Sequence, residues 1–287
     1  MGSSFSFRQK VAVDVGTFRI RVASGMFQLM ERPSMSALQA GVIVDADAAV
    51  SVLEPLLARV KVLGVVKPQV LTCAPSDVTW EERMRLIEVL MRAGATSVVV
   101  VPEPLAAAIG AEMDVSSPYA QMVIDIGDGV TDCAVIRSSR VLTGFSQRTG
   151  CAALRNALVK RVNVSQEQAD KLLHSFGVSL SRNRLHHQPD ETLRDEYEQY
   201  CSAVAPVVEI ILSAIDRFLK DIPAGMGAEV IDSGIVLTGG GALMPGMRSR
   251  VETETGIRTT CPGNPQTAVI KGAHAILPVV TALNQWP

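Results

Sequence analysis

Two short turns in the chain combine an acidic residue with glycine, each directly after an apolar run. The first is Asp14-Val15-Gly16-Thr17, after residues 11–14, and the second is Asp125-Ile126-Gly127-Asp128-Gly129, after residues 122–124. A glycine turn at a strand end lets backbone N–H groups approach a phosphate, because no Cβ stands in the way. An aspartate there can hold Mg²⁺ through the waters bound to the ion. Two such turns that face each other would grip a polyphosphate from both sides.

A third glycine-rich segment, Thr238-Gly239-Gly240-Gly241, follows the apolar residues 234–237 and opens a predicted helix. The N-terminus of a helix favours a phosphate group, so this segment suits the sugar and α-phosphate of a nucleotide. Each motif alone is weak evidence, because Asp-Gly sequences are common in turns. Three of them in this order are much less expected by chance and favour a nucleotide site.

The elements around the two acidic turns form a repeat. Each consists of an apolar strand, an aspartate, a glycine turn and a return strand, and further helices and strands follow. The first hairpin should turn at residues 14–18, and the second should return through residues 133–136. Two such α/β halves imply two similar domains that face each other. We expect the boundary between residues 109 and 122, where a Ser-Ser-Pro sequence marks a loop.

Hydrophobic spacing, helix caps and breakers predict the remaining elements. Strands are expected at residues 69–73, 97–101 and 234–237, and helices at residues 49–63, 79–92, 104–112, 151–162, 165–175, 242–255 and 267–277. A long helix over residues 196–219 should be interrupted at Pro206, because proline removes a helical hydrogen bond. The polar residues 180–194 should form a surface loop or a small subdomain.

Composition disfavours several classes of protein. The 287 residues carry a net charge of -2 and only 4% aromatic side chains, which argues against nucleic-acid binding as the main task. The five cysteines contain no CxxC pair, so neither a disulfide framework nor a zinc site is expected, and a reducing cytoplasm fits. No apolar run is long enough to predict a membrane span. Phe5 and Phe7 offer only a weak foothold on a membrane surface.

The three glycine motifs, in this order, resemble the phosphate-1, phosphate-2 and adenosine motifs of the superfamily of actin, sugar kinases and DnaK-type ATPases. Within it, the chain is most similar to the MreB family of bacterial actins. Residues 101–110 (VPEPLAAAIG) resemble the EEPMAAAIGAG stretch of that family, residues 148–150 its RIGG, and residues 254–272 its ETGIP ending. The resemblance implies an α/β protein with the actin-like ATPase fold, in which two ribonuclease-H-like α/β domains enclose a nucleotide cleft.

The resemblance also implies the domain organisation. Residues 1–115 would form domain I, and residues 116–287 would form domain II with a small IIB insertion around residues 163–220. Residues 41–45 (GVIVD) already match a later stretch of the family, so most of subdomain IB is expected to be missing after residues 32–34. Subdomain IB makes protofilament contacts in long actins, so we expect weaker assembly here.

Single residues receive roles from the resemblance. Glu103 falls where the family positions the attacking water, and Thr131 would be a second polar contact near the γ-phosphate. Asp14 and Asp125 would flank Mg²⁺ through waters. Arg21 stands where actin has a phosphate-contacting lysine, although a surface arginine on a strand is an equal alternative. The phosphates would be cradled by Gly16, Thr17, Gly127, Asp128 and Gly129, and the nucleoside would be contacted by Gly239, Gly240, Gly241 and the helix that contains Asp170 and Lys171.

Two residues depart from the family pattern within the expected site. Phe18 replaces the usual small residue under the phosphates, and its ring would either narrow the pocket or turn into the core. Pro102 precedes Glu103 in place of the family's glutamate. These departures leave open whether ATP hydrolysis is retained.

Three functions fit these features. The first is an ATP-binding bacterial actin, a slow Mg²⁺-dependent ATPase that forms filaments and organises cell shape or another cellular structure. The second is a non-filamentous, chaperone-like relative of the type of EutJ, and the third is a nucleotide-binding scaffold without hydrolysis. The implied ligands are ATP or ADP and Mg²⁺. The implied partners are further copies of the chain, head to tail, and a membrane surface or membrane-bound protein, with no nucleic acid. The implied location is the cytoplasm or the inner face of the membrane.

Overall fold

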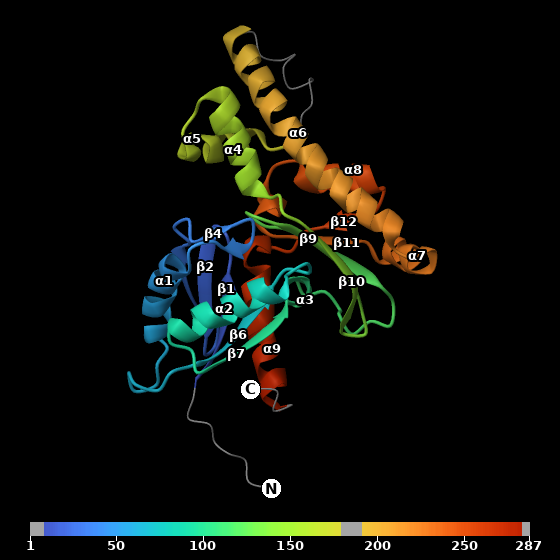
Figure 1. The fold of residues 1–287 in the computed structure, drawn as a ribbon. Coiled ribbons are helices and arrows are strands. Elements are labelled where there is room, and N and C mark those ends of the chain that lie inside the picture. The colour runs from blue at the N-terminus through green and yellow to red at the C-terminus, as the bar shows by residue number, and fades with distance from the viewer. Residues whose placement is uncertain (1–8, 179–190, 283–287) are drawn as a thin grey trace.

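Two five-stranded sheets of the same topology form the frame of the molecule (Figure 1). The computed structural model describes residues 9–178 and 191–282. In each sheet three antiparallel strands are followed by two parallel ones, in the orders β3-β2-β1-β6-β7 and β10-β9-β8-β11-β12. The strands are β1 Lys10–Val15, β2 Arg19–Ser24, β3 Gln28–Pro33, β6 Gln69–Ala74, β7 Ser97–Pro102, β8 Gln121–Ile126, β9 Thr131–Arg137, β10 Arg140–Gln147, β11 Ile235–Thr238 and β12 Thr259–Thr260. The repeat in the sequence is therefore a repeat of sheet topology.

Helices form three layers around these sheets. The outer face of the first sheet is covered by α1 (Ala46–Ala58) and α2 (Trp80–Arg92), and α3 (Glu103–Gly110) and α9 (Ala268–Ala282) lie between the sheets (Figure 1). The outer face of the second sheet packs against α4 (Cys151–Val162), α5 (Gln166–Phe176), α6 (Glu191–Asp221), α7 (Ala224–Ser233) and α8 (Met247–Thr255). The short elements are β4 (Leu38–Gln39), β5 (Val42–Ile43), η2 (Gly240–Leu243) and η3 (Pro265–Thr267). The result is an α/β sandwich with a helical layer in the middle.

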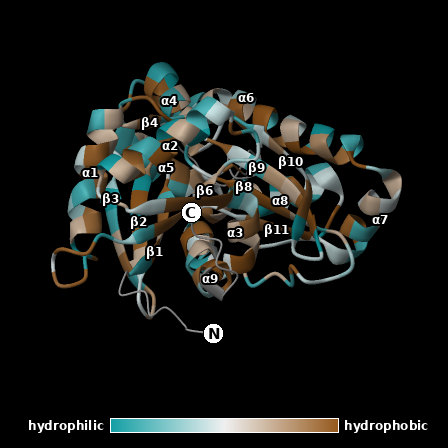
Figure 2. Ribbon diagram, turned by 60° about the horizontal axis from the view of Figure 1, so that its bottom comes forward, coloured by the Kyte–Doolittle hydropathy of each residue, from teal (hydrophilic) through white to brown (hydrophobic). Residues whose placement is uncertain are grey.

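Alternation along the strands explains why both faces of each sheet are covered. Val11 and Val13 of β1 pack toward α1 and α2, whereas Ala12 packs toward α3 and α9. In β8, Ile124 belongs to the outer cluster and Val123 to the middle one. Successive side chains of a strand point to opposite faces, so these strands are apolar throughout. Figure 2 shows both apolar and polar colouring on the covering helices α1 and α2, which have one buried and one solvent face.

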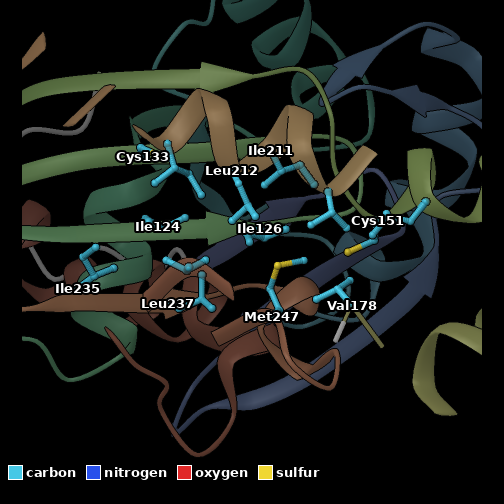
Figure 3. Packing of buried hydrophobic residues seen from close by; sticks show 14 of the residues in the cluster. Ile124, Ile126, Cys133, Cys151, Val178, Ile211, Leu212, Ile235, Leu237 and Met247 are labelled. Atoms are coloured by element: carbon cyan, nitrogen blue, oxygen red, sulfur yellow. The ribbon is translucent and has the colours of Figure 1, made fainter. Parts of the chain in front are cut away.

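The outer core of the second sheet joins residues that are distant in sequence. Ile124 and Ile126 of β8 pack in one buried cluster with Leu212 of α6, Leu237 of β11 and Met247 of α8 (Figure 3). Fully burying a large aliphatic side chain stabilises a fold by about 1.5–3 kcal/mol. This cluster therefore fixes β8, and with it the second acidic turn, against the rest of the half.

The two helices of the middle layer cross at glycines. A Cβ on Gly110 of α3 would lie 2.7 Å from the Gly272 nitrogen, and one on Gly272 of α9 would lie 2.8 Å from the Gly110 nitrogen. The two backbones are therefore in direct contact, and no larger residue fits at the crossing. Helix α9 also packs against β1, β2 and β6. Residues from the end of the chain thus cover the first sheet, while the domain boundary near residue 115 stays a prediction.

The main elements match the sequence expectations, with several corrections. The interruption at Pro206 is wrong, because α6 continues through it from Glu191 to Asp221. Proline inside a helix costs about 3 kcal/mol, which the burial of Val204, Val208 and Ile211 on one face of α6 can offset. The sequence did not indicate β3, β10 or α7. The first helix ends at Ala58 rather than residue 63, and the helix expected from residue 242 is divided into η2 and α8.

Some sequence expectations fall on residues that are not described. Most of the polar segment 180–194 lies outside the described residues, as do Phe5 and Phe7. Within the described part of the chain, no helix combines the length and the apolar character needed to cross a membrane.

Candidate functional site

The two acidic turns share one backbone frame. The Gly16 N–H donates to the Arg19 carbonyl at 3.2 Å, and the Gly127 N–H donates to the Val130 carbonyl at 2.8 Å. A Cβ at Gly16 would lie 2.9 Å from the Arg19 oxygen, and one at Gly127 would lie 3.1 Å from the Val130 oxygen. A Cβ at Gly16 would force a shift of the backbone and one at Gly127 would be tight, which favours glycine in each turn. Both frames leave the aspartate at the end of its strand.

The turns face each other across a cleft. The Thr17 hydroxyl of the first turn accepts a hydrogen bond from the Gly41 N–H at 3.0 Å. A Cβ on Gly129 of the second turn would overlap this hydroxyl, and it would lie 2.7 Å from the Gly41 nitrogen and 2.9 Å from the Ala40 Cα. Gly129 is thus required where the two halves approach most closely.

A cavity of about 290 Å³ opens at this meeting point. Twelve of the fifteen residues assigned from the sequence line it: Asp14, Gly16, Thr17, Arg21, Glu103, Asp125, Gly127, Asp128, Gly129, Asp170, Gly239 and Gly240. Thr131, Lys171 and Gly241 are not among the lining residues. The Thr131 hydroxyl donates to the Thr149 carbonyl at 2.8 Å, and Lys171 pairs with Glu167 on an exposed face of α5. Gly241 is buried against Ile126.

Asp14 is held by a cation from its own hairpin. Arg21 Nη1 donates to Asp14 Oδ2 at 3.1 Å, and Arg21 Nε donates to Glu31 Oε2 at 3.2 Å. Both members of the Asp14–Arg21 pair are nearly buried, so Arg21 is not a surface arginine. Burial raises the pKa of Asp14, and the charge and hydrogen bond of Arg21 oppose this rise.

Asp125 is held by a neutral group. Its Oδ2 accepts a hydrogen bond from the Thr238 hydroxyl at 2.7 Å. Burial raises the pKa of Asp125 to about 6, against the lowering effect of this hydrogen bond, and the charge of Asp14 raises the pKa further. A divalent cation between the two carboxylates would remove their mutual repulsion and lower both pKa values.

Glu103 lies at the start of α3, where β7 ends at Pro102. Pro104 occupies the first turn of the helix, a position in which proline needs no N–H partner. The pKa of Glu103 rises well above its ordinary value, first because of burial and then because of the charges of Asp125, Asp14 and Asp132. A raised pKa makes the Glu103 carboxylate a stronger proton acceptor, which suits general-base chemistry.

A polar seam that the sequence assigned to no role joins the two halves beside Glu103. Arg148, which follows β10, donates to Asp77 at 2.8 Å, to Glu82 at 3.1 Å and to the Ala40 carbonyl at 3.0 Å. On the same seam, Asp132 accepts from the Ser76 N–H at 2.9 Å and from the Ser146 hydroxyl at 3.0 Å. Burial raises the pKa of Asp132 to about 7. The Arg-Thr-Gly motif at residues 148–150 was the only feature of the sequence that indicated this polar seam.

The cavity has further lining residues, several of them apolar, that sequence reasoning also missed. It is lined by Leu173, His174, Leu243, Met244 and Gln266, in addition to Asp170 and the glycines of the third motif. Leu173 and His174 lie one helical turn after Asp170 on α5, so the helical period around Asp170 was the available signal. An apolar pocket with a few polar groups is suited to a nucleoside.

Phe18 does not turn into the core. Its side chain is 49% exposed and lines the cavity, so the first of the two sequence alternatives is the one the structure shows. Arg155 of α4, also a lining residue, pairs with Asp128 at 2.6 Å and with Asp170 at 3.4 Å. Nothing in the sequence motifs marked Arg155.

Two sheets of equal topology around a shared helical layer, with phosphate-type turns that face each other over a cavity, define a protein with the actin-like ATPase fold. The profile of the family described as MreB/Mbl protein matches residues 30–172 and 182–285. The chain belongs to the MreB/Mbl family.

Curated relatives agree with this assignment. The cell shape-determining protein MreB of Escherichia coli K12 is 29% identical over 259 residues, which cover 84% of this chain and 74% of the relative. The cell shape-determining protein Mbl of Bacillus subtilis 168 is 26% identical over 257 residues, with 84% and 77% covered.

Solved structures show the same fold. MreB5 of Spiroplasma citri bound to AMPPNP superimposes with a TM-score of 0.84 at 21% identity, over 98% of this chain and 99% of the other. The MamK double helical filament gives 0.74 at 16% identity, over 94% and 99%. The ethanolamine utilization protein EutJ from Carboxydothermus hydrogenoformans gives 0.68 at 21%, over 95% and 91%. The fold is therefore shared with EutJ, but the family is MreB/Mbl.

Proposed function

We propose that this protein is a bacterial actin that binds Mg²⁺–ATP between its two halves and assembles head to tail into filaments that organise cell shape or another cellular structure. The observation that carries the proposal is the pair of acid–glycine turns, which share one backbone frame and face each other at the cavity. Membership of the MreB/Mbl family supports it, as do the nucleotide in the MreB5 structure and the filament form of MamK.

The nucleotide would lie with its phosphates at the two turns and its base at the apolar lining residues. Gly239 lines the cavity, and its φ of 82° with a Cβ position 2.6 Å from the Ile126 carbonyl carbon explains why this residue is a glycine. The Gly16 and Gly127 N–H groups donate within their own turns, so other backbone N–H groups of the turns would bind the β- and γ-phosphates. Leu173 and His174 would contact the nucleoside.

The two buried carboxylates fit a magnesium ion that keeps most of its waters. Among the described residues, no group of three or more His, Cys, Asp or Glu side chains forms an all-protein metal site. Magnesium in nucleotide sites is usually bound by one or two carboxylates together with phosphates and waters. Asp14 and Asp125 would supply these carboxylates, and the ion would neutralise phosphate charge.

Glu103 would orient the attacking water and accept its proton. Thr131 would act only indirectly, because its hydroxyl is directed to the Thr149 carbonyl. Glu103→Gln should slow hydrolysis about 10²–10⁴-fold and leave ATP affinity within a few fold. Phosphate release measured beside nucleotide binding tests this role. Equal turnover in the variant rejects it, and absent turnover in the native protein would favour the scaffold function.

Filament formation is tested by sedimentation and light scattering at tens of micromolar protein. Nucleotide-free protein is compared with protein in Mg²⁺–ATP and in a slowly hydrolysed analogue, and pelleted material is examined by electron microscopy. Actin-type contacts join two different patches, so the assembly does not close and should grow with concentration. A monomer under all these conditions, with lipid included, would favour the EutJ-like alternative.

A membrane surface is a candidate partner because of one exposed turn. Leu63 and Val65 are 90% and 75% exposed at the tip of a turn closed by the Val62–Val66 bridge, and Lys61 and Lys67 flank it. Apolar side chains beside basic ones suit an anionic lipid surface. Co-sedimentation with vesicles containing phosphatidylserine should decrease in a Leu63→Ser, Val65→Ser variant. Unchanged binding would place the contact elsewhere.

A further inference from the structure

Phe18 of the first turn and Gly129 of the second occupy equivalent positions but differ greatly in side-chain size. Phe18 follows Gly16 by two residues in the first turn, and Gly129 follows Gly127 by two residues in the second. Gly129 has no room for a side chain, whereas the Phe18 ring projects into the cavity and stays half exposed. An aromatic ring left half in water at a binding site contributes little to the core, so its contacts within the cavity indicate what it does.

The ring contacts a guanidinium group from the opposite half. Arg155 Cζ lies 5.3 Å from the centroid of the Phe18 ring, within the range of a cation–π interaction. Phe18 belongs to the first half and Arg155 to α4 of the second, so this contact spans the cleft. Arg19 Cζ lies 5.4 Å from the same centroid, but Arg19 is the next residue in the chain and does not bridge the halves.

Arg155 is fixed in place by two carboxylates. It pairs with Asp128 of the second turn at 2.6 Å and with Asp170 of α5 at 3.4 Å, and its side chain is only 12% exposed. In the proposed binding mode, Asp128 would lie near the phosphates and Asp170 near the nucleoside. Arg155 therefore stands where the sugar and the phosphates of a nucleotide would join, and the Phe18 ring reaches it from the other side.

We propose that Phe18 and Arg155 form a gate across the cleft that must open before a nucleotide can leave. This inference rests on the proposed nucleotide binding and adds the residues that set its residence time. The gate closes when the two halves approach and the ring meets a guanidinium group held by two ion pairs. Opening separates the ring from the guanidinium group, so loss of this contact should make release faster.

The test is the dissociation rate of a fluorescent ATP analogue with Mg²⁺, measured by stopped flow during a chase with unlabelled ATP. Phe18→Ala should release the nucleotide about 5–20-fold faster, as expected for the loss of a partly desolvated cation–π contact. Phe18→Leu keeps an apolar side chain without the π face and should release faster than the native protein. Phe18→Tyr should retain slow release.

A second pair of variants links the effect to Arg155. Arg155→Lys keeps a positive charge near Asp128 and Asp170 but presents a compact ammonium group instead of a planar one. Combined with Phe18→Ala, it should show a double-mutant cycle in which the two effects do not add, because both remove one contact. Tyr119→Ala removes an exposed aromatic side chain outside the cavity lining and is the matched control.

The outcomes are distinct. A native protein that binds no nucleotide, although folded by circular dichroism, removes the proposed function and the gate with it. Native binding with unchanged release in Phe18→Ala or Phe18→Leu overturns the gate alone. Additive effects of Phe18→Ala and Arg155→Lys overturn the assignment of Arg155 as the partner.

Discussion

The two acidic turns share a backbone but differ in what stands opposite each aspartate. In the first hairpin the cross-strand partner of Asp14 is Arg21, and in the second the partner of Asp125 is Asp132. Residues directly opposite each other in antiparallel strands have neighbouring side chains. Asp14 is therefore neutralised within its own hairpin. Asp125 takes a hydrogen bond from Thr238, and Asp132 accepts from the Ser76 N–H of the other half.

The two halves therefore have the same turn, but the charged groups around the two aspartates differ. In the first half, Asp14 pairs with Arg21 of the same hairpin, so this ion pair does not depend on whether the cleft is closed. In the second half, the additional acidic residue is Asp132, which takes part in the contact between the halves. We therefore expect the contact between the halves to respond to pH through Asp132, because burial raises its pKa to about 7, whereas the first turn is held by a permanent cation.

The largest expected effect comes from breaking the local pair of the first turn. Arg21→Met would leave the nearly buried Asp14 without its cation, and removal of one partner from a buried pair costs about 3–5 kcal/mol. The free energy of unfolding in urea should fall by about this amount. A double variant with Asp14→Asn should recover much of the loss.

Arg32→Met, on an exposed position of β3, is the control and should change stability by less than about 0.5 kcal/mol. An Arg21→Met protein as stable as this control would show that the first turn does not depend on its internal cation.

The next effect concerns the approach of the turns. Gly129→Ala would push the second turn away from Thr17 and Gly41, and overpacking of this kind costs about 1–3 kcal/mol. ATP affinity, measured by isothermal titration with Mg²⁺, should fall about tenfold to hundredfold. Gly227→Ala has open space around it on α7 and should leave affinity unchanged. Native affinity in Gly129→Ala would mean that a nucleotide does not need both turns at once.

The role of Asp132 in the polar seam is tested by the pH dependence of the unfolding free energy. Burial raises the pKa of Asp132 to about 7 from an ordinary value of 3.8, so the folded protein holds a proton in this window that the unfolded chain releases. The contribution of Asp132 to stability is complete below about pH 4 and is lost as the pH rises to 7. Asp132→Asn should reduce the fall of unfolding free energy over this window by about 1.4 kcal/mol per pH unit. An unaltered slope would exclude Asp132 as the titrating group.

The smallest expected change in stability tests whether the two turns have the same backbone arrangement. Gly16→Ala and Gly127→Ala would place their methyl groups 2.9 Å and 3.1 Å from equivalent carbonyl oxygens. Each should destabilise the protein by about 1 kcal/mol, and the two values should agree within about 0.5 kcal/mol. Thermal and urea unfolding of the pair measure this agreement. A large difference would show that the two turns are similar in outline only.

Local features of the sequence were sufficient to predict the two turns and the hairpins around them. The aspartate and glycines of each turn act within a few residues, so their hairpins and the start of the helix at Thr79 followed from short-range rules. The common topology and the actin-like ATPase fold were also predicted, because the motif order carried them. Glu103 and Asp170, which the resemblance assigned to the site, both line the cavity, and their roles there stay predictions.

Residues whose partners are distant in sequence could not be predicted. Arg148 contacts residues 66–108 positions earlier, and Arg155 reaches Phe18 only after the cleft has formed. Lys171 does not line the cavity but pairs with Glu167 on α5, so its contact with a nucleoside stays a prediction. The unbroken α6 shows the same limit, since the apolar contacts that hold it through Pro206 come from other elements.

The position of α9 has a consequence for how the protein is made. The middle face of the first sheet is completed by residues 268–282, which leave the ribosome after the whole second half has been synthesised. Until then Ala12, Leu71 and their neighbours lack part of their apolar cover, and exposed apolar surface of this kind promotes aggregation. The middle face of the first sheet therefore lacks its complete cover until residues 268–282 have been synthesised.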